Sequence, residues 1–374
     1  MEDSCHPVNC IIPPHMAEKI LANGTPGQKK KISEYIRVAG QMRGQRQQLA
    51  ELSKQGLAAE GERNRKVYNA GNASDLPGTL ARGEGDAPTG DAAVNEAYDG
   101  SGATYDLFAG IFGRNSIDNQ GMDLVSTVHF LEGYDNAFWN GEQMVYGDGD
   151  EDLPEQERLF NRFTSAIDII GHELTHGVIQ YEANMVYRDQ PGALNESFSD
   201  VFGSLVKQHL NMQEAHEADW LIGEGLFTGH VDAEGIRSMK APGTAYDDPL
   251  LGRDPQPGHM NDYVDTTSDN GGVHINSGIP NKAFYNVAIE MGGYAWEKAG
   301  RIWYKSLCEA LDQSSDFQAA ASLSYKVAGD LYGSDSPEQK AVYNGWKAVG
   351  IVPVSERPRG CLGRAQEVWN RIFG

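Results

Sequence analysis

The chain has 374 residues, which is room for two folded units, because a single hydrophobic core rarely grows beyond about 250–300 residues. Its formal net charge is −22, unevenly spread: residues 1–66 hold 11 Lys/Arg against 7 Asp/Glu, and the remainder holds 20 against 46. Such an acidic body excludes nucleic-acid binding, which needs clustered Lys and Arg, and no apolar run is long enough to cross a membrane.

Residues 1–60 form a basic leader ahead of the acidic body. Its first residues, Met1-Glu2-Asp3-Ser4, lack the charged-then-apolar pattern of a signal peptide. A Pro13-Pro14 pair follows, and then helical-looking sequence at Met16–Leu21 and Gln28–Gln55. Opposite charges predict that leader and body attract each other; the alternative is a solvated, partly disordered arm. A disulfide framework is not expected from the four cysteines, which lie at Cys5, Cys10, Cys308 and Cys361.

The first part of the body, to about Tyr146, has strand-like sequence. Pieces such as Lys66-Val67-Tyr68 and Leu124–Val128 alternate with turn-rich segments, as expected of a β-rich unit. The run Gly147-Asp148-Gly149-Asp150 is expected to be a solvated turn and not a metal site.

Helical patterns dominate from Pro154 onward. The last clear helix is predicted to begin at Ser336-Pro337 and to end at Gly350. No role is predicted for the tail, residues 353–374.

A helix is predicted over Phe160–Tyr181, because apolar residues recur there every three or four positions. Its middle reads His172-Glu173-Leu174-Thr175-His176. Positions i and i+4 share one face of a helix, so His172 and His176 can reach one metal ion, and imidazole suits zinc. Glu173 lies beside the first ligand, where it can act as a general base on water. The alternative is a buried helix whose two histidines are simply hydrogen-bonded.

A catalytic zinc site needs a third protein ligand and one open position. A histidine six residues after the second is excluded, because Glu182 stands there. Glu196 and Asp200 are i and i+4 at the start of another apolar-periodic run, and Glu196 is predicted to be the third ligand. Asp200 is expected to accept the other ring N–H of a ligating histidine, and Asn195 is assigned to the same supporting layer. The alternative is that the two acids only favour the helix N-terminus through its dipole.

These residues resemble the thermolysin family of neutral zinc metallopeptidases, in which HExxH is followed by nineteen residues and then Glu. Asn136–Gly141 resembles the family's substrate-edge strand, and Asp269–Gly278 resembles its catalytic-histidine segment. The resemblance runs from about Lys66 to Val352. It implies an α+β fold with a β-rich N-terminal lobe (66–180), a mainly helical C-terminal lobe (181–352) and the zinc helix at the floor of the cleft between them.

The resemblance also implies which groups stabilise the oxyanion of the tetrahedral intermediate. His274 and Tyr187 would donate hydrogen bonds to it, and Asp269 would orient His274. Read without the resemblance, Tyr187 is a core aromatic and His274 is a histidine in a Gly-rich turn.

Substrate contacts follow from the same resemblance. Asn136 and the backbone of Ala137 would pair with an extended peptide, as an edge strand does. Arg237 would bind the carbonyl beyond the cut; the alternative is a surface ion pair. The pocket for the residue after the cut would be apolar, so cleavage is expected before Leu, Phe, Ile or Val. Its predicted lining is Phe160, Phe163, Ile169 and Ile236.

The leader resembles the short N-terminal propeptide of the protealysin branch of the family, which carries a double proline. Self-cleavage between about Gln45 and Lys66 would then release the mature enzyme. A thiolate is a good zinc ligand, so Cys10 is a candidate for holding the precursor latent. The alternative is that Pro13 and Pro14 simply lie in the cleft and Cys10 is a small buried hydrophobe.

One departure from the family concerns calcium. Family members with a double calcium site have a carboxylate where this chain has Lys207, and Leu221 stands at another expected acid. Asp168, Asp219 and Glu224 remain. We therefore expect the paired calcium site to be absent, with Lys207 bridging these acids; a single calcium ion elsewhere stays possible.

The resulting expectation is a monomeric, self-processing endopeptidase with one Zn²⁺, whose partners are protein or peptide substrates and its own leader. Secretion is expected although no signal peptide is recognisable, and a cytoplasmic location is the alternative. Two other functions compete: a silent relative that only binds peptides, which the filled catalytic positions disfavour, and a zinc-stabilised structural module, which normally has four protein ligands.

Overall fold

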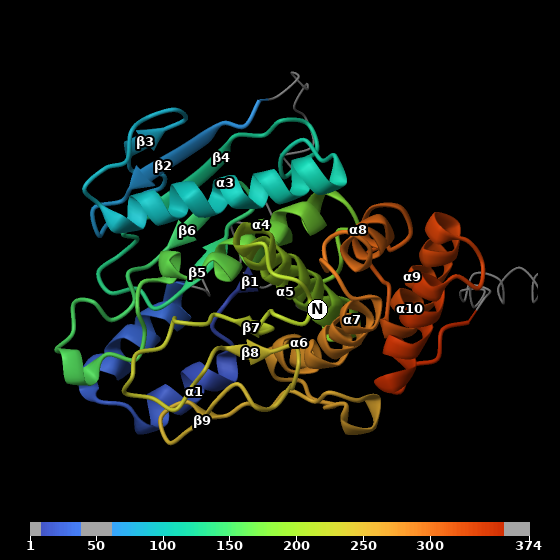
Figure 1. The fold of residues 1–374 in the computed structure, drawn as a ribbon. Coiled ribbons are helices and arrows are strands. Elements are labelled where there is room, and N and C mark those ends of the chain that lie inside the picture. Colours follow the sequence, from blue (N-terminus) through green and yellow to red (C-terminus); the bar gives the residue numbers. More distant parts are fainter. Residues whose placement is uncertain (1–8, 39–61, 355–374) are drawn as a thin grey trace, which may run out of the picture.

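The computed structural model describes residues 9–38 and 62–354. Figure 1 shows a β-sheet region crossed by one long helix and, next to it, a region built mainly of helices. This division confirms the predicted α+β fold. The sheet has six strands in the order β1-β5-β6-β4-β2-β3. Their bounds are β1 Asn9–Cys10, β2 Arg65–Asn69, β3 Thr79–Gly83, β4 Leu124–Val128, β5 Ala137–Trp139 and β6 Met144–Tyr146.

The pairing within the sheet is mixed. Strand β4 runs parallel to both β2 and β6, whereas β3 and β5 are antiparallel to their neighbours. Strand β1 belongs to the leader and pairs antiparallel with β5, so that Cys10 lies opposite Phe138. Without the leader, β5 would be an edge strand.

Helix α3 (Ala92–Phe112) was not predicted, because the sequence was interpreted as strand-like up to about residue 146. The Asp91 side chain caps it by accepting hydrogen bonds from the amides of Ala93 and Val94, and Gly113 ends it in the left-handed conformation. At Gly100 an added Cβ would lie 2.4 Å from Ile170 Cδ1, so glycine allows α3 to approach the helix that carries Ile170.

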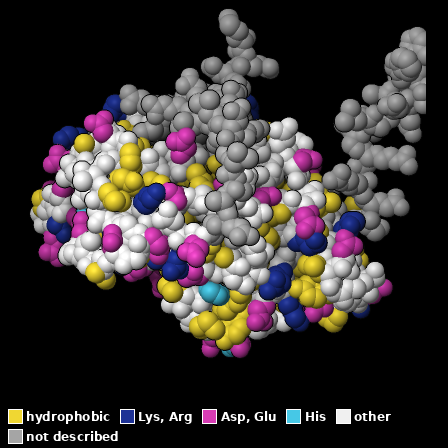
Figure 2. Space-filling model, turned by 90° about the horizontal axis from the view of Figure 1, so that it is seen from above, with side chains coloured by type: hydrophobic (Ala, Val, Ile, Leu, Met, Phe, Trp, Pro, Cys, Tyr) yellow, Lys and Arg dark blue, Asp and Glu magenta, His cyan; other side chains and the backbone are white. Residues whose placement is uncertain are grey.

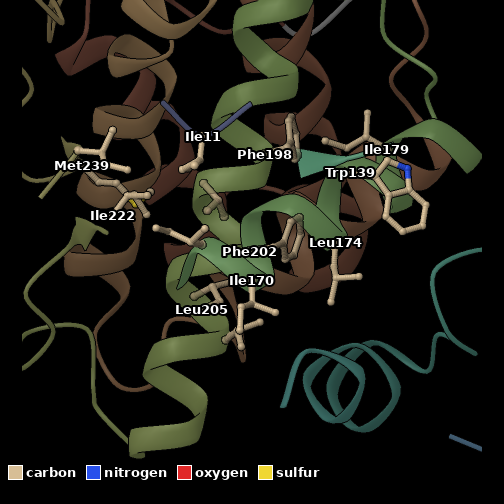
Figure 3. Packing of buried hydrophobic residues seen from close by; sticks show 14 of the residues in the cluster. Ile11, Trp139, Ile170, Leu174, Ile179, Phe198, Phe202, Leu205, Ile222 and Met239 are labelled. Atoms are coloured by element: carbon tan, nitrogen blue, oxygen red, sulfur yellow. The ribbon is translucent and has the colours of Figure 1, made fainter. Parts of the chain in front are cut away.

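Two central helices differ from their predicted bounds. Helix α4 spans Ile167–Tyr181 and not Phe160–Tyr181, because Phe160 forms a β-bridge with Phe227 and Phe163–Ser165 is a 3-10 turn. Helix α5 spans Asp189–Asn211, so Glu196 lies in its second turn and not at its start. The two helices approach closely, because a Cβ on Gly203 of α5 would lie 2.4 Å from the Asp168 carbonyl oxygen of α4. Figure 3 shows apolar side chains of both helices in one buried cluster, among them Ile170, Leu174, Phe198, Phe202 and Leu205.

Most of the remaining elements belong to the helical lobe. Helix α10 begins at Pro337 after a Ser336 cap and ends at Ala348, close to the predicted bounds. Helix α6 (Asp269–Asn276) is kinked, with left-handed backbone at Asn270, Gly271 and Gly272. The other helices of this lobe are α7 Gly278–Met291, α8 Ala299–Glu309 and α9 Phe317–Tyr332. One 3-10 turn, Glu155–Glu157, belongs to the N-terminal lobe, and another, Met260–Asp262, belongs to the helical lobe. Two short antiparallel strand pairs are β7 Leu221–Ile222 with β8 Arg237–Ser238 and β9 Asp247–Asp248 with β10 Gly252–Arg253.

The described part of the leader contacts both lobes (Figure 1). Helix α1 (Pro14–Asn23) reaches the C-terminal lobe, where Asn23 donates a hydrogen bond to the Pro249 carbonyl oxygen. Residues 26–38 form a second helix, and Gln28 in it donates to the Glu157 carbonyl oxygen of the N-terminal lobe. The rest of the predicted Gln28–Gln55 helix, the predicted cleavage region before residue 62 and almost all of the tail lie outside the described residues.

The turn at Gly147-Asp148-Gly149-Asp150 is not solvated as predicted. Gly147, Gly149 and Asp150 are buried, and Asp150 is 0 % exposed. The Asp150 carboxylate accepts hydrogen bonds from the amides of Leu159 and Phe160. The turn is therefore part of the core of the N-terminal lobe.

The surface seen in Figure 2 carries acidic and basic side chains interspersed, with small apolar groups between them. Within residues 9–38 and 62–354, no helix combines the length and the apolar character needed to traverse a lipid bilayer.

Candidate active site

Helices α4 and α5 bring together the three predicted zinc ligands. His172 Nε2 and His176 Nε2 lie 3.0 Å apart, and the carboxylate of Glu196 lies 3.6 Å from the first and 3.4 Å from the second. Three ligands at tetrahedral angles around Zn²⁺, each at about 2.0–2.1 Å, would be separated by about 3.3 Å. All three side chains are at most 1 % exposed. The donor set and its spacing therefore fit one zinc ion.

Glu173 also lies close to the histidines: one possible ligand atom from each of His172, Glu173 and His176 falls within a 4.8 Å group. However, Glu173 Oε2 accepts a hydrogen bond from the Trp139 amide of β5 at 3.0 Å. Because Glu196 faces both imidazole nitrogens directly, it is the better third ligand, and Glu173 lies between the histidines and the edge strand.

The Nδ1 atoms of both histidines are held by hydrogen-bonding partners. His172 Nδ1 donates to Asp200 at 2.8 Å, as predicted from the sequence. His176 Nδ1 lies 2.7 Å from Asn195 Oδ1 and 2.9 Å from Ser199 Oγ. These contacts leave Nε2 of each ring as the atom that can bind a metal. Ser199 was missed, although its position three residues after Glu196 on the same helix offered a signal.

Asp200 is the centre of a buried polar network. Arg237 donates to both of its oxygens, at 2.7 and 2.8 Å, and Asn281 Nδ2 donates to Oδ2 at 2.8 Å. Burial alone would raise the pKa of Asp200, but Arg237 and then His172 outweigh it and hold the pKa far below its usual range. Asp200 is therefore ionised. Arg237 is 1 % exposed and not the surface residue of the alternative interpretation, and Asn281 was not anticipated.

Tyr187 and His274 both lie beside Glu196. Tyr187 Oη donates to Glu196 Oε1 and lies 3.1 Å from His274 Nε2. His274 Nδ1 lies 2.6 Å from Asp269 Oδ1, and its backbone amide donates to Asp269 Oδ2 at 2.8 Å. Burial would lower the pKa of His274, but the charges of Asp269 and Glu196 raise it to about 9. His274 is therefore buried and charged at neutral pH, and it lies in the kinked helix α6.

The leader lies along β5 in the position predicted for a peptide. The Ile11 amide donates to the Ala137 carbonyl oxygen at 3.4 Å, and the Ile12 amide donates to Asn136 Oδ1 at 3.3 Å. Arg237 Nη1 lies 3.5 Å from the Ile11 carbonyl oxygen. These are the three groups that the resemblance assigns to substrate binding. The Cys10 side chain lies outside what the structure describes. Pro13 occupies the N-cap position of α1, and Pro14 is the first residue of that helix.

The four apolar residues predicted to line the pocket are all buried, with exposed fractions of 0–1 %. Phe160 and Phe163 have ring centroids 5.9 Å apart, and Ile169 and Ile236 both lie within 4 Å of a Cβ placed on Gly223. Ile11 of the leader is fully buried in the same hydrophobic cluster, where Figure 3 shows it near Ile222 and Met239.

The Lys207 ammonium lies between the acids that it was predicted to bridge. It is 2.6 Å from Asp219, 2.7 Å from Glu224 and 3.7 Å from Asp168. Leu221 lies in β7, and its amide donates to Asp219 Oδ1. The predicted bridging is confirmed; the absence of a paired calcium site stays a prediction.

Comparison with known proteins assigns the chain to a family along most of its length. Residues 39–180 match the thermolysin metallopeptidase catalytic domain, and residues 183–351 match its alpha-helical domain. An extracellular metalloprotease of Pectobacterium carotovorum subsp. carotovorum is 48% identical over 346 residues, which are 92% of this chain and 97% of the relative. Protease PrtS of Photorhabdus sp. (strain Az29) is 54% identical over 77% of this chain and 76% of its own length.

A solved structure is similar as well. The precursor of protealysin, a metalloproteinase from Serratia proteamaculans, superposes with a TM-score of 0.82 at 50% identity, covering 92% of this chain and all of that chain. Both domains of the family are thus matched in order, and the histidine and glutamate side chains that its zinc chemistry requires lie together. The chain belongs to the thermolysin family of metallopeptidases.

Proposed function

We propose that this metallopeptidase is a self-processing zinc endopeptidase that cuts peptide bonds on the N-terminal side of bulky apolar residues. The observation that carries the proposal is the spacing of 3.0–3.6 Å among the two Nε2 atoms and the Glu196 carboxylate. Zn²⁺, when bound by His172, His176 and Glu196, lowers the pKa of water and polarises a carbonyl group.

Glu173 is the proton carrier in this proposal. The Trp139 amide holds its Oε2 atom and thereby orients the carboxylate, which takes the proton of the attacking water and passes it to the leaving nitrogen. Because Trp139 lies on β5, the same strand that would pair with the peptide orients the carboxylate that acts on it.

Tyr187 Oη and His274 Nε2 are the proposed donors to the oxyanion. They lie 3.1 Å apart and both face the Glu196 side of the site. Because the pKa of His274 is raised to about 9, both ring nitrogens carry protons at neutral pH: Nδ1–H donates to Asp269, and Nε2–H is the proposed donor to the substrate oxygen.

The leader supports both the cleavage preference and the latency. Its Ile11 makes the backbone contacts expected of the residue after the cut, and its side chain is fully buried. A peptide with Leu, Phe, Ile or Val at that position would present a similar apolar side chain to the pocket of Phe160, Phe163, Ile169 and Ile236. The leader thereby occupies the place of substrate, and ligation by the Cys10 thiol remains a separate proposal that Cys10→Ala tests through precursor latency.

Export from the cell is also proposed, since the relative from Pectobacterium carotovorum subsp. carotovorum is named extracellular. Activity in the culture medium of the producing cells would support export, and activity confined to lysed cells would contradict it.

Glu173→Gln tests the chemistry. This variant keeps the size of the side chain and should bind one zinc ion per chain while kcat for casein or a peptide falls by several orders of magnitude. Glu155→Gln, an exposed glutamate in a 3-10 turn, is the matched control and should keep full activity. If the Glu173→Gln variant retained activity that a zinc chelator removes, another base would have to be found. A peptide library cleaved before Asp or Lys would contradict the proposed specificity.

A further inference from the structure

A buried ammonium of the leader is surrounded by oxygen atoms of the N-terminal lobe. Lys31 is 7 % exposed, and its Nζ donates to the Gly149 carbonyl oxygen at 2.9 Å and to Asp152 Oδ1. It also lies 3.2 Å from Asp150 Oδ1 and 3.9 Å from Asp135 Oδ1. The leader supplies the cation of this cluster, and the lobe supplies all four oxygens.

The oxygens are held in place by the lobe itself. Asp150 Oδ2 accepts hydrogen bonds from the Leu159 and Phe160 amides at 2.7 and 3.0 Å, which fixes the direction of the carboxylate. Asp135 and Asp150 are 2 % and 0 % exposed, and their Oδ1 atoms accept no hydrogen bond from the described residues. Two buried oxygen atoms thus point at the ammonium without another partner to satisfy them.

The backbone also leaves room for a cation at this place. Gly133 has φ +59°, and a Cβ there would lie 2.5 Å from Lys31 Nζ and 2.6 Å from Asp152 Oδ1. Any side chain at residue 133 would therefore intrude on the volume that the ammonium fills.

Departure of the leader would leave the three carboxylates without a counter-charge from the part of the chain that the structure describes. Carboxylates held this close together repel one another, so the cluster would take up protons or another cation. Burial and then the charge of Asp150 raise the pKa of Asp135 well above its usual value even beside Lys31, so protons compete for the site. Three carboxylates and a carbonyl group are hard oxygen donors, which suit Ca²⁺.

We propose that Asp135, Asp150, Asp152 and the Gly149 carbonyl oxygen form a Ca²⁺ site that Lys31 fills until the leader is removed. The proposal rests on the self-processing put forward above. Latency and calcium binding are then mutually exclusive at this site, because one ammonium and one Ca²⁺ ion cannot share the same oxygens.

Calcium titration of the zinc-loaded full-length chain tests the site without using peptidase activity. All variants carry Glu173→Gln, which prevents self-processing. Adding Lys31→Met should let the chain bind one more Ca²⁺ ion than the parent, measured by calorimetry in the absence of magnesium. Adding Asp135→Asn and Asp150→Asn as well should abolish that extra ion. Lys30→Met, which changes the exposed neighbouring lysine, is the matched control and should leave the calcium stoichiometry unchanged.

The self-processed wild-type chain gives a second measurement, which does not depend on the folding of any variant at the proposed calcium site. Once its leader has been removed, it should bind one more Ca²⁺ ion than the Glu173→Gln precursor. Equal calcium stoichiometry for the parent and the folded Lys31→Met variant, or proton uptake with no calcium bound, would overturn the proposal. Failure of the wild type to process itself would instead refute self-processing and leave the comparison of the variants to decide on the site.

Discussion

Replacement of Gly203 by alanine tests whether the close approach of α4 and α5 assembles the metal site. A Cβ at residue 203 would lie 2.4 Å from the Asp168 carbonyl oxygen and 3.0 Å from the His172 amide nitrogen. Both are backbone atoms, so no side-chain rotation relieves the contact. Helix α5 would have to move by about 0.6 Å merely to reach the 3.0 Å limit of observed Cβ contacts.

The expected magnitude follows from comparing this glycine with one in open space. Overpacking a core costs about 1–3 kcal/mol. Gly110, in helix α3, has no neighbouring atom within 4 Å of an added Cβ, so Gly110→Ala should stabilise the fold by about 0.5–1 kcal/mol. Both glycines lie inside helices, so the gain from replacing a helical glycine cancels in the comparison. The free energies of unfolding of the two variants should therefore differ by the overpacking cost, roughly 1–3 kcal/mol.

The metal site should weaken at the same time, because α5 carries Glu196 and Asp200 whereas α4 carries both histidines. We expect Gly203→Ala to bind zinc about 10–100-fold more weakly, as when a supporting contact to a ligand is lost. Urea unfolding in the Glu173→Gln background, which avoids self-digestion, gives the stability, and competition with a chromogenic chelator gives the affinity. Zinc affinity and stability equal to those of Gly110→Ala would refute the reasoning.

Three further predictions concern charges outside the zinc ligands. Hydrogen bonds to Asp148, and to a smaller extent to Asp91, raise the pKa of His129 from 6.5 to about 9. Because the pKa is raised in the folded state, protonated His129 stabilises the protein fully below pH 6.5, and this stabilisation is lost as the pH rises through about 9. Melting temperatures of Glu173→Gln with and without His129→Asn should therefore converge toward high pH, and a constant difference would contradict this. The melting temperature of Lys207→Glu should rise when calcium is added, because a fourth carboxylate joins Asp168, Asp219 and Glu224. If calcium left this melting temperature unchanged, Lys207 would not be the group that prevents calcium binding. Arg237→Lys keeps the charge but loses the paired hydrogen bonds to Asp200, so stability should fall by about 1.5–3 kcal/mol and KM for peptides should rise; unchanged values of both would show that the paired geometry is unimportant.

The metal ligands could be predicted from the sequence because helical geometry fixes which side chains meet. His172 and His176 share a face by their spacing alone, and Asp200 follows Glu196 by one turn, so its contact with His172 needed only the packing of two amphipathic helices. The roles of Tyr187, His274 and Arg237 had no such local basis, since they lie on separate elements, and the resemblance to a family was needed to select them.

Other features were missed for physical reasons that can be named. Helix α3 buries mostly small residues, among them Ala93, Ala97, Gly100 and Thr104, so its apolar stripe is weak in the sequence. The zinc helix was predicted seven residues too long, because Phe160 and Phe163 continue the helical spacing while their backbones form a bridge and a 3-10 turn. Partners from distant segments, such as Asn281 to Asp200 and Gln256 to the His274 carbonyl oxygen, leave no pattern in the sequence.

Lys31, which is buried, and Lys207, whose side chain is 12 % exposed, show why a count of acids does not predict a metal site. Lys207 and Lys31 each form ion pairs with three carboxylates. Lys207 lies on α5, the helix that carries Glu196, so it cannot leave while the fold persists. Lys31 lies on the leader, so the predicted cleavage region separates it in the sequence from the carboxylates that it contacts. If the leader departs, the ion pairs of Lys207 persist, whereas those of Lys31 are lost. Covalent connection, and not the local set of carboxylates, therefore decides which of the two clusters can exchange its ammonium for Ca²⁺.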